Sequence, residues 1–106
     1  MTSRSTWKKR ERNIARDLGT DRTPLSGSNS RHTSSDTLSD IFYVESKLRA
    51  SPPGWTLFEE TALKASKENK IPLVIYSKKF KQKKQIVCDY DWLIGIIRQL
   101  YDIELK

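Results

Sequence analysis

The stretch IFYVESKL, residues 41–48, decides the fold. It opens with four β-branched or aromatic residues, the types that strands favour, so it predicts a β-strand. Side chains alternate between the two faces of a strand, which places Glu45 and Lys47 on one face and Ser46 on the other. A carboxylate and an ammonium thus lie side by side on an element that otherwise has the composition of a buried one. Alone, an E-x-K pattern is typical of a salt-bridged edge strand.

Length and composition bound the class of protein. With 106 residues, of which 36% are hydrophobic and 31% charged, the chain suits one small domain over residues 1–106. No apolar run approaches the roughly 18–20 residues of a membrane span, and the polar N-terminus lacks the apolar region of a secretory signal. The single cysteine, Cys88, excludes an internal disulfide, and one cysteine with one histidine argues against a zinc site. We therefore expect a reducing, cytoplasmic location, in the host cell if the chain is viral.

The net charge of +7 and the pI of about 9.7 favour a polyanionic partner. Nucleic acid is the most frequent such partner, and an anionic membrane surface is the alternative. The basic residues cluster in two segments, residues 8–16 and 78–84, on either side of the 41–48 strand. The second segment predicts either a solvated hairpin tip or a connection that contacts DNA.

Residues 7–18 predict a helix that is closed by Gly19. Its apolar residues recur at helical spacing and share one face. They are Trp7, Ile14, Ala15 and Leu18. Glu11 follows Trp7 by four positions and precedes Ile14 by three, so it points along the same face. A carboxylate that faces a core needs a cation or a metal as partner. The simplest alternative is partial burial with an ion pair to Arg10 or Arg12.

Residues 20–35 predict a polar loop that is too long for a simple connector. We expect it to be mobile and to contact DNA, because its hydroxyls, Asn29, Arg22, Arg31 and His32 are residue types that bind phosphate oxygens. A flexible serine-rich loop without a binding role is the alternative.

Two aspartates compete for a place beside Glu45. If a tight turn falls near residues 39–41, Asp36 lies opposite Glu45 in a hairpin, at the roughly 5 Å of cross-strand neighbours, and the two can share a divalent metal. For Asp40 to face Glu45, residues 41–44 would have to form the loop, and these are strand formers. Asp36 is the preferred metal ligand, and Asp40 remains the alternative.

The second half of the chain completes an alternation of helices and strands. Residues 50–54 break the chain, and Thr56 with Glu59 forms a possible capping box for a helix that ends near residue 69. The uninterrupted apolar run 72–76 predicts a central strand covered on both faces. Residues 85–88 predict a further strand.

A last helix follows, capped by Asp89 or Asp91. Its apolar face is wide for so small a domain. The face comprises Trp92, Leu93, Ile96, Ile97, Leu100 and Tyr101. Such a face either closes the core or forms a dimer interface.

The motifs together resemble the PD-(D/E)xK nuclease superfamily, and within it the archaeal and phage Holliday junction resolvases. The matching parts are Glu11 in a basic first helix, RTPLSG at residues 22–27, Asp36, and VESK at residues 44–47. The resemblance covers residue 7 to about residue 100. It implies an α/β fold with a small restriction-endonuclease-like mixed central sheet flanked by helices. Two departures stand out: TLSD follows Asp36 where an apolar strand is usual, and no Gln lies near the helix at residues 59–61.

The resemblance also implies a site and an activity. The activity is Mg²⁺-dependent DNA endonuclease cleavage, with Mn²⁺ as a substitute, by a homodimer that resolves four-way junctions through paired nicks. Asp36, Glu45 and the backbone carbonyl of Ser46 would hold the metal, and Glu11 would complete the site directly or through water. Lys47 would position or help deprotonate the attacking water and bind the scissile phosphate.

Further expectations concern the surroundings of this site. Ser26 would act from a mobile catalytic loop, as implied by the resemblance. Crowded carboxylates without metal should raise the pKa of one of them, so that metal binding and deprotonation are coupled. The residues expected to contact DNA are basic side chains from both basic segments and the polar loop. They are Lys8, Lys9, Arg12, Arg22, Arg31, His32, Lys81, Lys83 and Lys84.

Two other functions fit parts of the pattern. One is a restriction-like or repair nuclease with a different DNA preference. The other is a non-catalytic basic module that binds nucleic acid, which would leave Glu11, Asp36 and Glu45 unexplained. The expected partners are DNA and a second copy of the chain, and no membrane.

Overall fold

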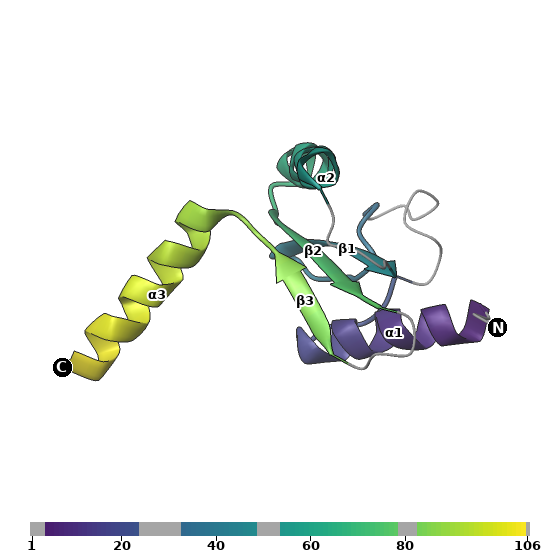
Figure 1. The fold of residues 1–106 in the computed structure, drawn as a ribbon, viewed down its shortest axis with the longest axis horizontal. Coiled ribbons are helices and arrows are strands. Elements are labelled where there is room, and N and C mark those ends of the chain that lie inside the picture. Colours follow the sequence, from purple (N-terminus) through teal and green to yellow (C-terminus); the bar gives the residue numbers. More distant parts are fainter. Residues whose placement is uncertain (1–3, 24–32, 49–53, 79–82, 106) are drawn as a thin grey trace.

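The computed structural model describes residues 4–23, 33–48, 54–78 and 83–105. It contains three helices and a three-stranded mixed sheet, which confirms the α/β class expected from the sequence (Figure 1). The elements are α1 (Arg4–Asp17), β1 (Phe42–Leu48), α2 (Trp55–Lys67), β2 (Ile71–Ser77), β3 (Lys84–Val87) and α3 (Tyr90–Leu105). Each element predicted from the sequence is present, with ends that differ by a few residues.

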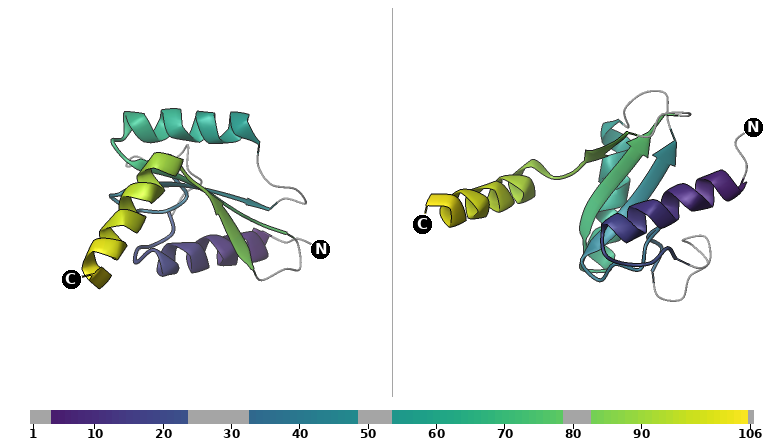
Figure 2. Two further views of the ribbon diagram at one scale, coloured as in Figure 1. Left: turned by 60° about the vertical axis from the view of Figure 1, so that its left-hand side comes forward. Right: turned by 90° about the horizontal axis from the view of Figure 1, so that it is seen from below.

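The sheet has the order β1-β2-β3, and β2 is its central strand. β1 and β2 are parallel, with Phe42 beside Ile71 and Leu48 beside Ser77. β3 is antiparallel to β2. α1 covers one face of the sheet and α2 the other (Figures 1 and 2). The uninterrupted apolar run of β2 correctly predicted a central strand with both faces covered.

The core consists of two layers, one on each face of the sheet. On the α1 face, Ile14 packs with Val44 and Ile75. Strand alternation places Tyr43 and Val74 on the α2 face, where both are completely buried. Burial of one large apolar side chain contributes about 1.5–3 kcal/mol. These two layers therefore hold β1 in place between the helices.

The helix ends follow the sequence signals in two of three cases. Gly19 has φ +76°, as expected of the residue that closes a helix. The Asp89 carboxylate caps α3, since its Oδ1 accepts a hydrogen bond from the N–H of Trp92 at 3.0 Å. The predicted capping box of Thr56 and Glu59 does not form. α2 begins at residue 55 with Gly54 as N-cap and no side-chain capping bond, so Thr56 already lies in the first turn.

α3 extends away from the sheet and from both other helices (Figures 1 and 2). Its first turn is attached to β1, where Trp92 packs edge-on against Phe42 with ring centroids 5.7 Å apart. Four large apolar side chains further along the helix are exposed, namely Leu93, Ile96, Leu100 and Tyr101. α3 therefore does not close the core of its own chain, which was one of two roles expected for it. None of the described helices is long and apolar enough to cross a membrane.

Candidate functional site

Residues 33–40 run along the free edge of β1 and carry Asp36 to the middle of that strand. The Asp36 N–H donates a hydrogen bond to the carbonyl of Val44 at 2.9 Å, and the N–H of Ser46 donates to Asp36 Oδ2 at 2.7 Å. Asp36 therefore lies beside residues 44–46, as the sequence predicted. The hairpin that was expected to place it there is wrong, because residues 33–40 form no regular strand.

Buried hydroxyl groups explain the irregular course of this segment. Ser35 Oγ accepts a hydrogen bond from the Val44 N–H at 2.7 Å. The N–H groups of Thr37, Ser39 and Ile41 each donate to the hydroxyl two residues earlier, at 3.2–3.4 Å. Ser, Thr and Asp side chains compete with ladder hydrogen bonds in this way. The segment is thus held against β1 by side chains rather than by a backbone ladder.

Glu45 and Lys47 form the ion pair that strand alternation predicts. Lys47 Nζ lies 3.2 Å from Glu45 Oε1, and both side chains are partly exposed. Between them Ser46 points to the opposite face and is buried. Its N–H reaches Asp36, and the carbonyl of the same residue points toward the same strand edge. The free edge of β1 therefore combines two carboxylates, a carbonyl and an ammonium.

Electrostatic coupling links the residues of this cluster. Burial raises the pKa of the Asp36 carboxyl to about 7, and the carboxylates of Glu45 and Glu11 add to the rise. The N–H of Ser46 and the ammonium of Lys47 act in the opposite direction. The direction agrees with the expectation for crowded carboxylates, although burial is the largest cause. The proton is therefore held more tightly by Asp36 than by an ordinary aspartate.

Glu11 lies on the buried face of α1, as its spacing predicts, and it is paired with Arg22. Arg22 Nε donates to Glu11 Oε1 at 2.8 Å. The alternative ion pair, to Arg10 or Arg12, does not form. Arg10 donates instead to the hydroxyl of Ser77, and Arg12 is exposed, since neighbouring helix positions point about 100° apart. Arg22 reaches Glu11 because an antiparallel bridge joins residues 22 and 37 and brings the chain back past α1.

Asp36, Glu45 and the carbonyl of Ser46 are the oxygen donors that could hold a metal. Among the described residues, no group of three or more His, Cys, Asp and Glu side chains could hold a metal ion. Mg²⁺, however, is commonly bound by one or two carboxylates together with waters and substrate phosphate oxygens. Asp36, Glu45 and the Ser46 carbonyl fit that pattern. Glu11 is held by Arg22, so a contribution through water fits it better than direct ligation.

Asp40, the alternative ligand, lies elsewhere. It is exposed and precedes β1, which must still run from residue 42 to Glu45 at about 3.3 Å per residue, or about 10 Å. The structure therefore brings Asp36 rather than Asp40 to Glu45.

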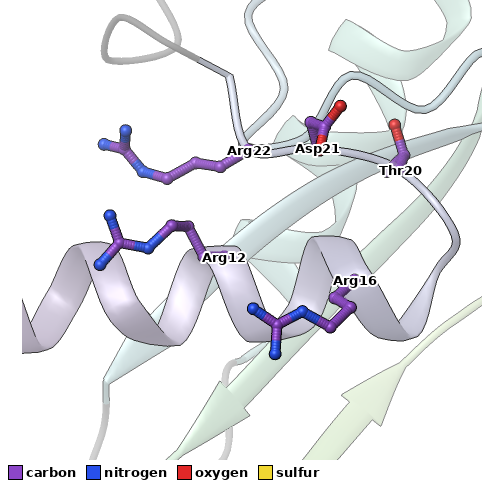
Figure 3. Close-up of a pocket in the computed structure, with 5 residues that line it drawn as sticks. All are labelled: Arg12, Arg16, Thr20, Asp21 and Arg22. Atoms are coloured by element: carbon purple, nitrogen blue, oxygen red, sulfur yellow. The ribbon is translucent and has the colours of Figure 1, made fainter.

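Three arginines line an open pocket of about 390 Å³ (Figure 3), and one of them, Arg22, is the partner of Glu11. They are Arg12 and Arg16 of α1 and Arg22, with Thr20 and Asp21 completing the wall. The guanidinium groups of Arg12 and Arg22 extend in the same direction (Figure 3). Arg16 was not among the residues expected to contact DNA, although its position four after Arg12 puts both on one helix face. Such a group of guanidiniums favours an anion, and above all a phosphate.

A second network holds the start of the 33–40 segment. Glu68, just beyond α2, accepts hydrogen bonds from the hydroxyl of Thr33, from the N–H of Ser34 at 3.1 Å and from Lys70 Nζ at 3.2 Å. Burial favours the neutral acid, but these donors prevail and lower the pKa of Glu68. Ser34 Oγ also bonds to the hydroxyl of Tyr43. Glu68 thus positions the segment that carries Asp36, a role with no signal in the sequence.

The remaining predicted DNA contacts divide into placed and unplaced residues. Lys9, Lys83 and Lys84 are exposed and Lys8 is partly exposed. Lys84 pairs with Ser77, the residue that Arg10 contacts, so the start of β3 lies near α1. The others fall outside the described residues. They are Arg31, His32 and Lys81, and Ser26, the residue expected to act from a catalytic loop, also lies outside the described residues.

No protein-family model matches the chain, and no match was found among curated proteins or solved structures. What supports a function is the arrangement of Asp36, Glu45 and Lys47 at the free edge of β1.

Proposed function

We propose that the chain is a Mg²⁺-dependent DNA endonuclease with a restriction-endonuclease-like fold, and that it resolves four-way junctions. The observation that carries the proposal is the position of Asp36. Its carboxyl accepts the N–H of Ser46, inside the E-x-K motif of residues 45–47, beside the Glu45–Lys47 ion pair. Asp36, Glu45 and Lys47 are the residues that the resemblance to the PD-(D/E)xK superfamily assigns to catalysis.

The site chemistry suits phosphodiester hydrolysis. A bound Mg²⁺ would supply Lewis acidity toward the phosphate and lower the pKa of a water molecule. Asp36, Glu45 and the Ser46 carbonyl would hold the ion at the free edge of β1. Asp36 must lose its proton to do so, which its pKa of about 7 allows at neutral pH. The Lys47 ammonium, partly exposed, would orient the attacking water and neutralise charge on the phosphate.

The charge distribution supports a DNA substrate. Arg12, Arg16 and Arg22 line a pocket next to Glu11, and Lys8 and Lys9 lie on the same helix. Guanidinium groups bind phosphate oxygens strongly because they donate from a planar fork. A duplex whose phosphates occupied this pocket would run past the free edge of β1. The arginines would then position the DNA, and the carboxylates would act on it.

A module that only binds nucleic acid would not use the buried carboxylates. Asp36 and Glu11 add negative charge next to the arginine pocket and lie in a poorly solvated place, which opposes binding of a polyanion. The negative charge and the poor solvation of these carboxylates are both explained if they hold a cation during catalysis.

Paired nicks require two sites, so the proposal includes a homodimer with two-fold symmetry, which matches the symmetry of a four-way junction. The preference for junctions comes from the resemblance, because nucleases with one fold and one type of site cut different DNA structures.

The test is cleavage of labelled four-way junction, linear duplex and single-stranded DNA, each with Mg²⁺ or with EDTA. Paired nicks in the junction alone, in Mg²⁺ alone, support the proposal. Cleavage of all three substrates supports a general nuclease, and binding without cleavage supports the non-catalytic module. Glu45→Gln should abolish cleavage, whereas the matched variant Glu59→Gln, at an exposed position of α2, should not.

A further inference from the structure

α3 presents an apolar stripe that is exposed in the single chain. Tyr90, Leu93, Ile96 and Leu100 recur at intervals of three and four residues, so they share one side of the helix, and Tyr101 adjoins Leu100 at the margin of that side. Their exposed fractions are 37–75%. A stripe of this kind on a 16-residue helix, about 24 Å long, is larger than the scattered apolar residues of an ordinary surface.

An apolar groove lies on the body of the molecule between α1 and the β2–β3 pair. It has a volume of about 270 Å³. Its apolar floor comprises Ile14, Leu18, Ile75 and Ile86, and Asp17, Lys84 and Gln85 form the rest of the lining. Ile14 packs on the first two strands, but Ile86 of β3 remains 51% exposed. The groove is therefore an uncovered part of the core.

α3 does not reach the groove of its own chain. Two residues join β3 to α3, and one of them, Asp89, caps the helix. Trp92 packs against Phe42 in the first turn. The ring contact fixes the first turn of α3 to β1, and from there the helix extends away from the body (Figures 1 and 2).

The net charge of α3 is opposite in sign to the lysines at the groove, Lys83 and Lys84. Residues 90–105 contain three acidic residues and one arginine, a net charge of −2 in a chain of net charge +7. Lys84 lines the groove, and Lys83 is its exposed neighbour. An acidic amphipathic helix is repelled by DNA and attracted by the basic body of another copy of this chain.

We propose that α3 of one copy docks in the α1–β2–β3 groove of a second copy, and that the second copy returns the same contact. The result is a two-fold dimer with exchanged C-terminal helices. At roughly 150–250 Å² for a large side chain, the five exposed residues of the stripe present on the order of 500 Å². Each copy gives one helix and one groove, so both surfaces of each copy contribute toward the roughly 800 Å² per partner of a stable interface.

The helix exchange deepens the proposed function, because paired nicking needs two sites. Its biological role rests on that function, but the association itself does not. Association is measured without DNA or Mg²⁺. A nuclease that proves monomeric would refute the helix exchange and the homodimer but leave the endonuclease activity standing, whereas a dimer without nuclease activity would refute the activity alone.

The experiment is sedimentation equilibrium over a concentration series, with circular dichroism as a check of folding. The wild-type chain should be dimeric at micromolar concentration. Leu100→Glu in the stripe and Ile86→Glu in the groove should each weaken the dimer by more than about tenfold. Both positions are more than half exposed, so the body should stay folded. The matched control Gln99→Glu, an exposed position beside the stripe, should remain dimeric.

Mixing the two variants tests the exchange directly. An equimolar mixture of Leu100→Glu and Ile86→Glu chains retains one intact helix and one intact groove that fit each other, so heterodimers should form where neither variant dimerises alone. If Ile86→Glu remains a dimer while Leu100→Glu does not, the stripes pair with each other and the groove proposal is overturned. A wild-type chain that is monomeric throughout overturns it as well.

Discussion

The free edge of β1 and α3 depart from the usual distribution of residues in opposite ways. At the edge, polar residues such as Ser35 and Thr37 are buried and the Asp36 carboxyl is poorly solvated, whereas α3 exposes leucine, isoleucine and tyrosine. Natural sequences depart from consistent burial mainly at functional positions. At the edge, the proposed function would supply a cation and a phosphate as compensation. On α3, the proposed helix exchange would supply apolar surface from another chain. The difference between the two regions thus indicates the kind of partner each one requires.

The largest expected effect is on catalysis at the edge. Asp36→Asn and Glu45→Gln each remove a proposed metal ligand, so cleavage of a four-way junction should fall by about 10³-fold or more. Binding of the junction should persist or become tighter, because negative charge next to the arginine pocket is removed. Single-turnover cleavage and a binding titration on the same preparations measure the two effects.

Asp40→Asn is the control for this experiment. Asp40 is exposed and lies before β1, so its removal should leave cleavage intact. Activity retained in Asp36→Asn together with loss in Asp40→Asn would move the ligand role to Asp40 and contradict the assignment.

The next effect is on stability and depends on pH. Asp36 has a pKa of about 7 in the folded protein against 3.8 in the unfolded chain. Between these values the native state binds the additional proton, so the free energy of unfolding falls as pH rises from about 4 to 7 and is level above. In EDTA at pH 8, Asp36→Asn should therefore be more stable than wild type by on the order of 2–4 kcal/mol.

Thermal unfolding measured from pH 4 to 8 tests this sign. The gain should shrink toward pH 4, where Asp36 is protonated in the native state and only partly ionised in the unfolded chain. Mg²⁺ should reduce the stability gain of Asp36→Asn at pH 8, because a cation stabilises the ionised wild-type carboxylate. An Asp36→Asn variant that is less stable than wild type at pH 8 without metal would show that the carboxylate is compensated by the protein itself.

A smaller effect concerns the arginine pocket. Arg12→Ala and Arg16→Ala should weaken junction binding and flatten its salt dependence by about one counterion each, because each neutralised phosphate releases about 0.9 of a cation. Arg98→Ala, an exposed arginine of α3, should leave the salt slope unchanged. If Arg16→Ala behaves like that control, the pocket does not contact DNA.

Sequence reasoning succeeded where one periodicity decides the answer. Alternation placed Glu45 and Lys47 together, and helical spacing placed Glu11 inward. It failed where a distant segment decides. Arg22 reaches Glu11 only because the chain bridges at residues 22 and 37, which no local pattern encodes. The serine and threonine residues at 35–39 have the composition of an ordinary loop, so their role in holding Asp36 was hidden.

α3 illustrates a third kind of limit. Its amphipathic pattern was clear from the sequence, but a pattern shows only that one side of a helix needs apolar surface, not which molecule supplies it. The two expectations for this helix, core closure and dimer interface, predict the same residues at the same spacing. The direction in which α3 leaves β3 (Figure 1) excludes core closure, and the ring contact between Trp92 and Phe42 fixes the first turn of the helix to β1.

The smallest expected effect distinguishes the stability of the body from that of the assembly. Leu93→Ser removes a stripe residue that is already 40% exposed in the single chain. At concentrations low enough for the wild type to be monomeric, the variant should change the free energy of unfolding by less than about 0.5 kcal/mol. At higher concentration, wild type should gain stability through association and Leu93→Ser should not, because only the dimer buries this position.

Val44→Ala, in the buried core, should instead cost about 1–3 kcal/mol at every concentration. Unfolding midpoints at several concentrations compare the three proteins, and a cost of Leu93→Ser that does not vary with concentration would mean that α3 packs on its own chain.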